Sequence, residues 1–196
     1  MERIRVPVYY DFASVICYVA HRVMERLAPT LEELEIELAW SPLDLAQLAP
    51  YRRGGSIPEA SRANAARIAQ ELSVPVRIPS RWLDSRPLNS AAIAAEELGR
   101  GESWRERVWT ALYREGLPVE DVAALAREAE IPLDSGAIAE ARGELESRTR
   151  LAARDMVTGV PTFMLGRWPF GGIQQQDTMR MVLECFASRS REGTLS

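Results

Sequence analysis

Asp11-Phe12-Ala13-Ser14-Val15-Ile16-Cys17 joins two segments whose apolar residues repeat with different periods. Before this stretch the period is two, as in a β-strand, and the apolar positions are Ile4, Val6, Val8 and Tyr10. After it, apolar residues recur at helical spacing as far as Leu27, and we expect Pro29 to close the helix. A helix N-terminus offers unpaired N–H groups and the positive end of the helix dipole. Residues 14–17 are therefore a candidate site for a thiolate or another anion.

A second strand is expected after this helix. Residues 36–40 alternate again, with Ile36, Leu38 and Trp40 on one face, and the pattern stops at Ser41-Pro42. A strand, a helix and a second strand form a right-handed parallel unit in nearly every known case. The N-terminal part of the chain therefore predicts two parallel strands connected by a helix.

The middle of the chain, roughly residues 55–155, has few strand signals and many apolar residues at helical spacing. We expect helices near residues 65–72, 91–98, 104–112, 122–129 and 138–156. Gly99 and Gly101 would close the second helix, and Ser103 with Glu106 would form a capping box for the third. Asp134-Ser135 would open the last helix. The proline-rich segment 75–87 is expected to be a structured connection.

Strand patterns return at Gly159-Val160-Pro161-Thr162. Thr162–Leu165 is a short apolar strand, and Trp168–Phe170 is its expected hairpin partner across a tight turn at Gly166-Arg167. The chain then predicts a final helix, whose apolar face is Met179, Val182, Leu183 and Phe186. From Ser188 onward the sequence is polar, and we expect a frayed tail.

The order of these elements, together with three motifs, resembles the DsbA family in its broad sense. That family includes a FrnE-like cytoplasmic branch, 2-hydroxychromene-2-carboxylate isomerases and kappa-class glutathione transferases. The motifs are Asp11-Phe12-Ala13-Ser14 leading to Tyr18, Arg86-Pro87-Leu88-Asn89-Ser90, and Val157-Thr158-Gly159-Val160-Pro161-Thr162-Phe163. The resemblance implies an α/β thioredoxin-like fold with an inserted all-helical domain. It divides the chain into a thioredoxin-like domain at 1–54 and 156–188, a helical insertion at 55–155 and a flexible tail at 189–196.

Ser14 departs from the dithiol members of this family. Those proteins carry C-x-x-C, in which the first cysteine attacks a disulfide and the second resolves the mixed intermediate. With Ser14 in the first position that cycle cannot run as written. Serine attack would need an adjacent base, and the only histidine, His21, is expected on the helix surface one turn beyond Cys17. The sequence leaves open whether Ser14 is natural or engineered, and Val15-Ile16 favours natural drift.

In the isomerase and kappa-transferase branch, a serine at this position hydrogen-bonds the sulfur of glutathione and stabilises its thiolate. The resemblance therefore implies glutathione or another low-molecular-weight thiol as cofactor, no metal, and isomerisation or transfer on a small aromatic substrate. It also implies a cis-proline at Pro161 and a ligand that pairs with the backbone of Val160. Gly172 and Gln174 loosely match a Gly-Gln-Asp run that contacts glutathione. The chain has S-V-I-C where that branch usually has S-P-Y-S.

Two other functions remain open. Cys17 alone could exchange disulfides through a mixed disulfide with a small thiol, which requires a reactive Cys17. Alternatively, the protein is a redox-inactive module that holds an extended peptide against the proline loop. Binding only of a cysteine-containing peptide would favour an enzyme instead. If Cys17 is packed among apolar side chains, its pKa is raised and the thiol is inert. Cys185 lies in an apolar helix pattern and is expected in the core.

Composition narrows the possible partners. The chain has 196 residues, of which 46% are hydrophobic and 27% charged, as in a soluble globular protein. A net charge of -4 argues against binding nucleic acid by neutralising phosphates. No stretch is long and apolar enough for a membrane span, and the N-terminus enters a strand without a signal-peptide pattern. We therefore expect a cytoplasmic protein, with a homodimer as one possible assembly.

Two groups of side chains are candidate ligand contacts. Apart from His21, every basic residue is an arginine, and Arg52, Arg53, Arg77 and Arg81 either form a local anion site or lie on a solvated surface. Most tryptophans are expected in the core. Trp82, in the proline-rich segment that would face a cleft between the two domains, is the one expected to contact a ligand.

Overall fold

The computed structural model describes residues 3–49, 52–119 and 121–193. Within them, four strands form one sheet in the order β2-β1-β3-β4. The strands are β1 (Ile4–Tyr10), β2 (Ile36–Pro42), β3 (Thr162–Leu165) and β4 (Trp168–Gly171). β1 and β2 are parallel, whereas β3 is antiparallel to both of its neighbours. These are the strands and the parallel pair that the sequence predicts.

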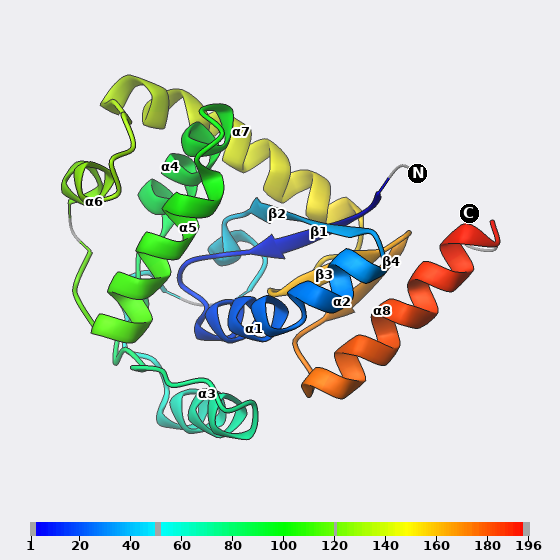
Figure 1. Cartoon of the computed structure of the whole chain (residues 1–196). Coiled ribbons are helices and arrows are strands. Elements are labelled where there is room, and N and C mark those ends of the chain that lie inside the picture. The colour runs from blue at the N-terminus through cyan, green and yellow to red at the C-terminus, as the bar shows by residue number, and fades with distance from the viewer. Residues whose placement is uncertain (1–2, 50–51, 120, 194–196) are drawn as a thin grey trace.

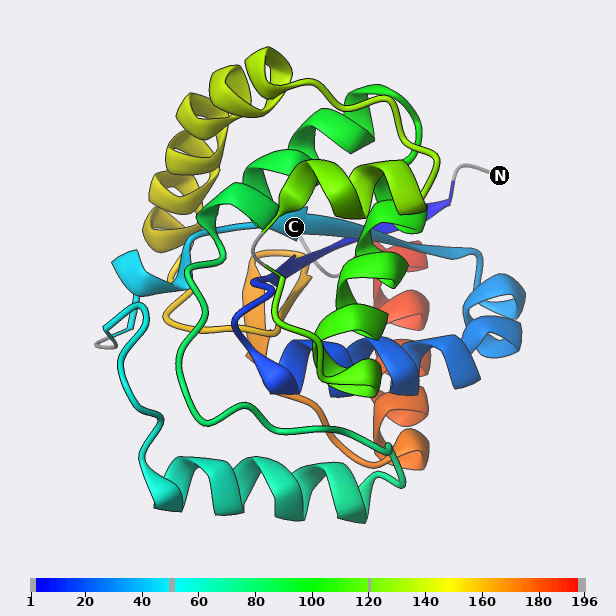
Figure 2. The same ribbon diagram turned by 90° about the vertical axis from the view of Figure 1, so that its left-hand side faces the viewer.

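Three helices lie beside the sheet in Figure 1. α1 (Val15–Arg26) and α2 (Ala28–Glu33) connect β1 to β2, and α8 (Gln176–Arg191) follows β4. Between β2 and β3 the chain is helical: η1 (Leu45–Gln47), α3 (Glu59–Glu71), α4 (Arg86–Glu97), α5 (Gly101–Trp109), η2 (Thr110–Glu115), α6 (Val122–Glu128) and α7 (Ser135–Arg154). α4 packs along α7 and against α5, and Figure 2 shows these helices together. The topology is therefore thioredoxin-like, with a helical segment inserted between β2 and β3.

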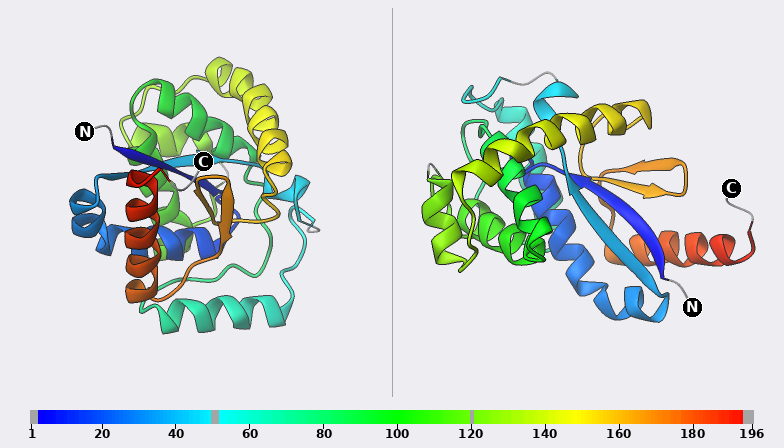
Figure 3. Two further views of the ribbon diagram at one scale, coloured as in Figure 1. Left: turned by 90° about the vertical axis from the view of Figure 1, so that its right-hand side faces the viewer. Right: turned by 90° about the horizontal axis from the view of Figure 1, so that it is seen from above.

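The core runs without interruption from the sheet into the inserted helices. Val6, Val8 and Tyr10 of β1 are fully buried, and they belong to the same apolar cluster as Trp104 and Trp109 of α5. The view from above in Figure 3 shows α7 crossing the sheet on the side away from α8. Burial of both tryptophans confirms their predicted place in the core. The shared cluster implies that the two parts stabilise each other.

The helix that follows the Ser14 turn, α1, ends at Arg26, just before Pro29, as predicted. Pro29 itself lies in the first turn of the short helix α2, where its missing N–H would be unpaired in any case. One predicted helix boundary is wrong. Ser103 with Glu106 does not cap α5, since that helix begins at Gly101 and Ser103 lies inside it. Gly99 adopts φ 68° and the Arg100 N–H closes back on the Ala95 carbonyl, so α4 ends in a left-handed turn that leads directly into α5.

The C-terminal helix differs from the sequence prediction in two respects. α8 continues to Arg191, so residues 188–191 are helical instead of frayed, and the last three tail residues, 194–196, lie outside the described part of the chain. Cys185 is exposed rather than in the core. Trp168, on β4, is likewise 55% exposed, unlike the buried tryptophans. In the described residues, no helix combines the length and apolar character needed to cross a membrane.

Candidate active site

Ser14 lies at the junction of a tight turn and α1. Its N–H donates to the Asp11 carbonyl at 3.0 Å, which closes a β-turn over Asp11–Ser14. Its hydroxyl oxygen accepts a hydrogen bond from the Cys17 N–H at 3.4 Å and so caps the first turn of α1. The residue is 8% exposed. The oxygen is occupied as an acceptor, and the same hydroxyl is within hydrogen-bonding reach of the Cys17 thiol, whose pKa it lowers.

The buried carboxylate of Asp11 holds this turn in place through hydrogen bonds. Asp11 is fully buried, and its two oxygens accept hydrogen bonds from the N–H groups of Ala13 and Leu45, each at 2.7 Å. Burial raises the pKa of Asp11, and hydrogen bonds from neighbouring groups oppose the shift. The carboxylate therefore links the turn to the segment that follows β2.

Two side chains of the insertion, the helical segment between β2 and β3, hold the middle of the turn. Asn89 of α4 accepts from the Phe12 N–H at 3.3 Å and donates to the Leu43 carbonyl at 2.9 Å. Tyr113 of η2 donates its hydroxyl hydrogen to the Phe12 carbonyl at 2.6 Å. Both side chains are buried. The two peptide groups that flank Phe12 are thus oriented by the inserted helices rather than by the sheet.

Cys17 lies behind Ser14 and has no access to solvent. Burial is the main reason that its pKa rises to about 12, while the nearby Ser14 hydroxyl acts in the opposite direction. Almost no thiolate forms at neutral pH with such a pKa, and the thiolate is the nucleophilic form. The motif therefore has a serine at its first position, and the cysteine at its last position is buried and unreactive.

The proline loop meets the same end of the sheet. The Val160–Pro161 bond is cis, as the resemblance implies. Because Tyr9 pairs with Thr162 in the antiparallel register, Pro161 lies near the level at which β1 ends and the Ser14 turn begins. The Gly172 N–H donates to the Pro161 carbonyl at 2.8 Å, which joins two of the predicted residues. Gln174 is exposed, and within the described residues no hydrogen bond joins it to the other five predicted site residues.

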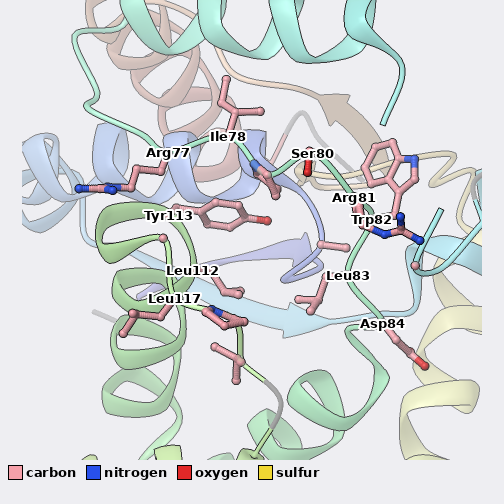
Figure 4. A pocket seen from close by; sticks show the side chains of 16 residues that line it. Arg77, Ile78, Ser80, Arg81, Trp82, Leu83, Asp84, Leu112, Tyr113 and Leu117 are labelled. Atoms are coloured by element: carbon pink, nitrogen blue, oxygen red, sulfur yellow. The ribbon is translucent and has the colours of Figure 1, made fainter. Parts of the chain in front are cut away.

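A cavity of about 530 Å³ opens beside the turn (Figure 4). Its wall includes Ala13, the residue before Ser14, and Trp82, as the sequence predicts. Figure 4 shows Tyr113 of η2 between the segment carrying Arg77 and Ile78 and the side chains of Leu112 and Leu117. Ser14, Cys17, Val160, Pro161, Gly172 and Gln174 are not among its lining residues. The lining combines apolar and aromatic side chains with the charged side chains of Arg77, Arg81 and Asp84.

The sequence did not identify Tyr113 or Leu112 as site residues. Both lie on η2, where the helix widens by one residue and the spacing of apolar positions no longer follows the α-helical period. Gly116, at φ 72° just after η2, was the available signal that the helix ends there. Arg77 and Arg81 line the cavity, whereas Arg53 pairs with Asp44 at 2.5 Å, so the four predicted arginines do not form one anion site.

His21 is buried, not on the helix surface as predicted. Its ring packs against Trp109 at 4.6 Å and Trp40 at 5.3 Å. Burial, with Arg105 and Arg22 nearby, lowers its pKa to about 3, so the imidazole is neutral at neutral pH. Glu25 and Glu106 lie close to His21, but the Arg22 guanidinium donates to both carboxylates at 2.8 and 2.6 Å. That single cation neutralises one of the two negative charges, and His21 lies seven residues after Ser14, about two turns along α1 and too far to serve as its base.

Known proteins with the same fold include an isomerase and disulfide oxidoreductases. The chain superposes on a 2-hydroxychromene-2-carboxylate isomerase with TM-score 0.71 and 19% identity, over 97% of this chain and 98% of the other. It matches a probable DsbA oxidoreductase from Streptomyces coelicolor with TM-score 0.76 and 20% identity, over 95% and 91%. It also matches the cytosolic disulfide reductase DsbM from Pseudomonas aeruginosa, solved with GSH, with TM-score 0.65 and 23% identity, over 93% and 98%.

At these identities the likeness concerns the fold alone, and no curated protein matches the chain. The family model of the DSBA-like thioredoxin domain, however, matches residues 5–184. That range begins in β1, includes the Ser14 turn, the inserted helices and the proline loop, and ends within α8. The chain therefore belongs to the DSBA-like thioredoxin domain family.

Proposed function

We propose that this protein binds a low-molecular-weight thiol, glutathione first among them, and uses it for isomerisation or transfer on a small aromatic substrate. One observation carries the proposal. Ser14 caps α1 where dithiol relatives have their first cysteine, while Cys17 is fully buried with a pKa raised to about 12. Since this site has no reactive thiol of its own, the sulfur nucleophile has to come from a ligand.

Each predicted residue has a stated role in the proposal. Ser14 donates its hydroxyl hydrogen to the ligand sulfur, and the N-terminus of α1 stabilises the negative charge that forms there. Val160 offers its backbone to the extended ligand, and Pro161 shapes the pocket beside it. Gly172 is held against Pro161, and Gln174 is proposed as a contact at the exposed end. Cys17 fills space beneath the site.

The cavity beside Ala13 is proposed as the substrate site. In the isomerisation, the thiolate sulfur forms a bond to an electron-poor carbon of the substrate, the adduct rotates about a bond freed by that addition, and the sulfur–carbon bond then breaks. The thiolate is restored, and no oxidant or reductant is consumed. In a transfer reaction the sulfur–carbon bond is kept, and a leaving group departs with its bonding electron pair. The aromatic side chains Trp82 and Tyr113 suit a planar substrate.

The relatives support the proposal at the level of the fold. One is a 2-hydroxychromene-2-carboxylate isomerase, and DsbM was solved with GSH. A cytoplasmic location belongs to the same proposal, because glutathione keeps that compartment reducing and DsbM is described as cytosolic.

The test is a calorimetric titration with reduced glutathione and with S-methylglutathione, using the wild-type protein and Ser14→Ala. We expect the wild type to prefer the free thiol, and Ser14→Ala to lose about tenfold in affinity for it, the value of a charge-assisted hydrogen bond. Affinity for S-methylglutathione should be similar in both proteins. Equal binding of both ligands by both proteins would contradict the proposal and favour a binding module that does not recognise the thiol.

A further inference from the structure

Tyr113 makes contacts on three sides, and each leads to a different part of the proposed site. Its hydroxyl donates to the Phe12 carbonyl at 2.6 Å. Its own carbonyl accepts from the Arg77 N–H at 2.7 Å, in the segment that forms one wall of the cavity. Its ring packs on Tyr18 of α1, with the ring centroids 5.5 Å apart. The residue is 2% exposed, and it lines the cavity.

The bond to Phe12 fixes one particular peptide group. The Phe12–Ala13 peptide presents its carbonyl to Tyr113 and its N–H to the Asp11 carboxylate at 2.7 Å. It is therefore held at both ends, and it is the central peptide of the turn that Ser14 closes. Rotation of this peptide would move Ala13 and change the direction in which the Ser14 side chain leaves the turn. Of the two side chains that hold it, only Tyr113 lines the cavity.

The helix geometry places Tyr113 at this point. η2 is a turn of wider π-type helix that continues α5, and such turns occur often at functional sites. The extra residue in the turn shifts the side chains after Thr110 relative to a regular helix. Gly116, in the left-handed conformation, then ends the helix directly after this turn. A regular α-helix would carry the residue at position 113 along a different direction.

We propose that Tyr113 is a positioning residue for Ser14, through which a ligand in the cavity acts on the turn that orients the Ser14 hydroxyl. A substrate bound in the cavity touches Tyr113 and Ala13, and the Tyr113–Phe12 hydrogen bond transmits the contact to the turn. The consequence for thiol binding rests on the proposed function. The effect on the turn itself does not, and it can be measured without any thiol.

The experiment compares Tyr113→Phe with Tyr10→Phe by amide hydrogen exchange of the segment containing residues 11–17. Both variants remove one buried tyrosine hydroxyl and keep the ring. The Tyr10 hydroxyl lies beside Arg105 and makes no hydrogen bond to the turn. We expect exchange in this segment to be about tenfold faster in Tyr113→Phe and unchanged in Tyr10→Phe. Equal exchange in the two variants would overturn the proposal.

A second readout separates positioning from general stabilisation. Glutathione binding by the two variants is followed across pH, through the ultraviolet absorbance of the bound thiolate. In Tyr113→Phe, thiolate formation should move to higher pH and the affinity should fall about three- to tenfold, whereas Tyr10→Phe should match the wild type. An unchanged pH profile in Tyr113→Phe would reduce the residue to a structural role. If the wild type binds no glutathione, the proposed function fails, and the exchange comparison still decides the role of Tyr113.

Discussion

At the scale of single residues, the fold makes the two cysteines opposite in reactivity. Cys17 is inaccessible with a pKa of about 12, whereas Cys185 is exposed on α8. We therefore expect iodoacetamide to label Cys185 readily in the native protein and to leave Cys17 unmodified over the same period. Mass spectrometry of the labelled peptides distinguishes the two sites, and both should react in denaturant. Rapid labelling of Cys17 in the native protein would contradict this expectation and support the hypothesis of thiol–disulfide exchange through that residue.

His21 should make stability depend on pH in the acidic range. Above pH 6.5 the imidazole is neutral in both the folded and the unfolded chain, but below it only the unfolded chain gains a proton, because burial lowers the folded-state pKa to about 3. The free energy of unfolding should therefore fall by about 1.4 kcal/mol per pH unit in this window on account of His21. Denaturant titrations of the wild type and His21→Phe at several pH values check this. The same pH dependence in both proteins would show that His21 does not contribute.

Both wrong residue predictions have geometric reasons. Cys185 is turned by about 125° from the centre of the apolar face formed by Met179, Leu183 and Phe186, so helical geometry alone could have placed it outside the core. His21 is different. It shares a face with Cys17, as predicted, but that face is covered by Trp40 and by Trp109 of the insertion. The sequence could not show which distant segment covers the helix.

At the scale of elements, the contact between α4 and the Ser14 turn should be a major source of local stability. Asn89→Ala leaves the buried Phe12 N–H and Leu43 carbonyl without partners and should cost about 2–3 kcal/mol of unfolding free energy. Ser90→Ala is the matched control. Ser90 is the next residue on α4, and its buried hydroxyl has no hydrogen-bond partner in the described part of the chain. Removing that hydroxyl should change stability by less than about 0.5 kcal/mol. Equal losses of unfolding free energy in the two variants, measured by urea denaturation, would argue against a stabilising role for the Asn89 hydrogen bonds.

The elements themselves were largely predictable because their patterns are local. Alternation set β1 and β2, and the Gly166-Arg167 turn set the β3–β4 hairpin. The start of α5 was not predictable, since it depends on the left-handed turn at Gly99 that joins it to α4. The widened turn of η2 was not predictable for a related reason. Tyr113 in this turn makes tertiary contacts with Phe12 and Arg77, and the spacing of apolar residues does not encode such contacts.

At the scale of the whole molecule, the sheet and the insertion should unfold together. Trp109 of α5 is fully buried and contacts the aromatic rings of four residues outside the inserted helices, namely Tyr10, Phe12, His21 and Trp40. Trp109→Ala should lower the unfolding free energy by about 3–5 kcal/mol. Tryptophan fluorescence and far-ultraviolet circular dichroism should still report one transition at the same denaturant concentration. Two separated transitions would mean that the insertion is an independent folding unit.

The sequence predicted the family and the topology because the Ser14 turn, the Arg86–Ser90 segment and the proline loop stand in a fixed order along the chain. It did not predict how the insertion acts on the site. The Ser14 turn is oriented by Asn89 and Tyr113. These residues are 77 and 101 positions away in sequence from Phe12, the turn residue that they contact. Those contacts exist only once the inserted helices pack on β1 and α1. The chemistry of Ser14 is therefore a property of the whole fold.

The most direct test of the account is the number of protons released when reduced glutathione binds. Calorimetry at neutral pH in two buffers of different ionisation enthalpy measures it for the wild type and for Ser14→Ala. If Ser14 and the N-terminus of α1 stabilise the thiolate of the ligand, the wild type should release about one proton per glutathione bound, and Ser14→Ala should release clearly less. Binding of glutathione by the wild type without proton release would contradict the central claim that this site holds a thiolate.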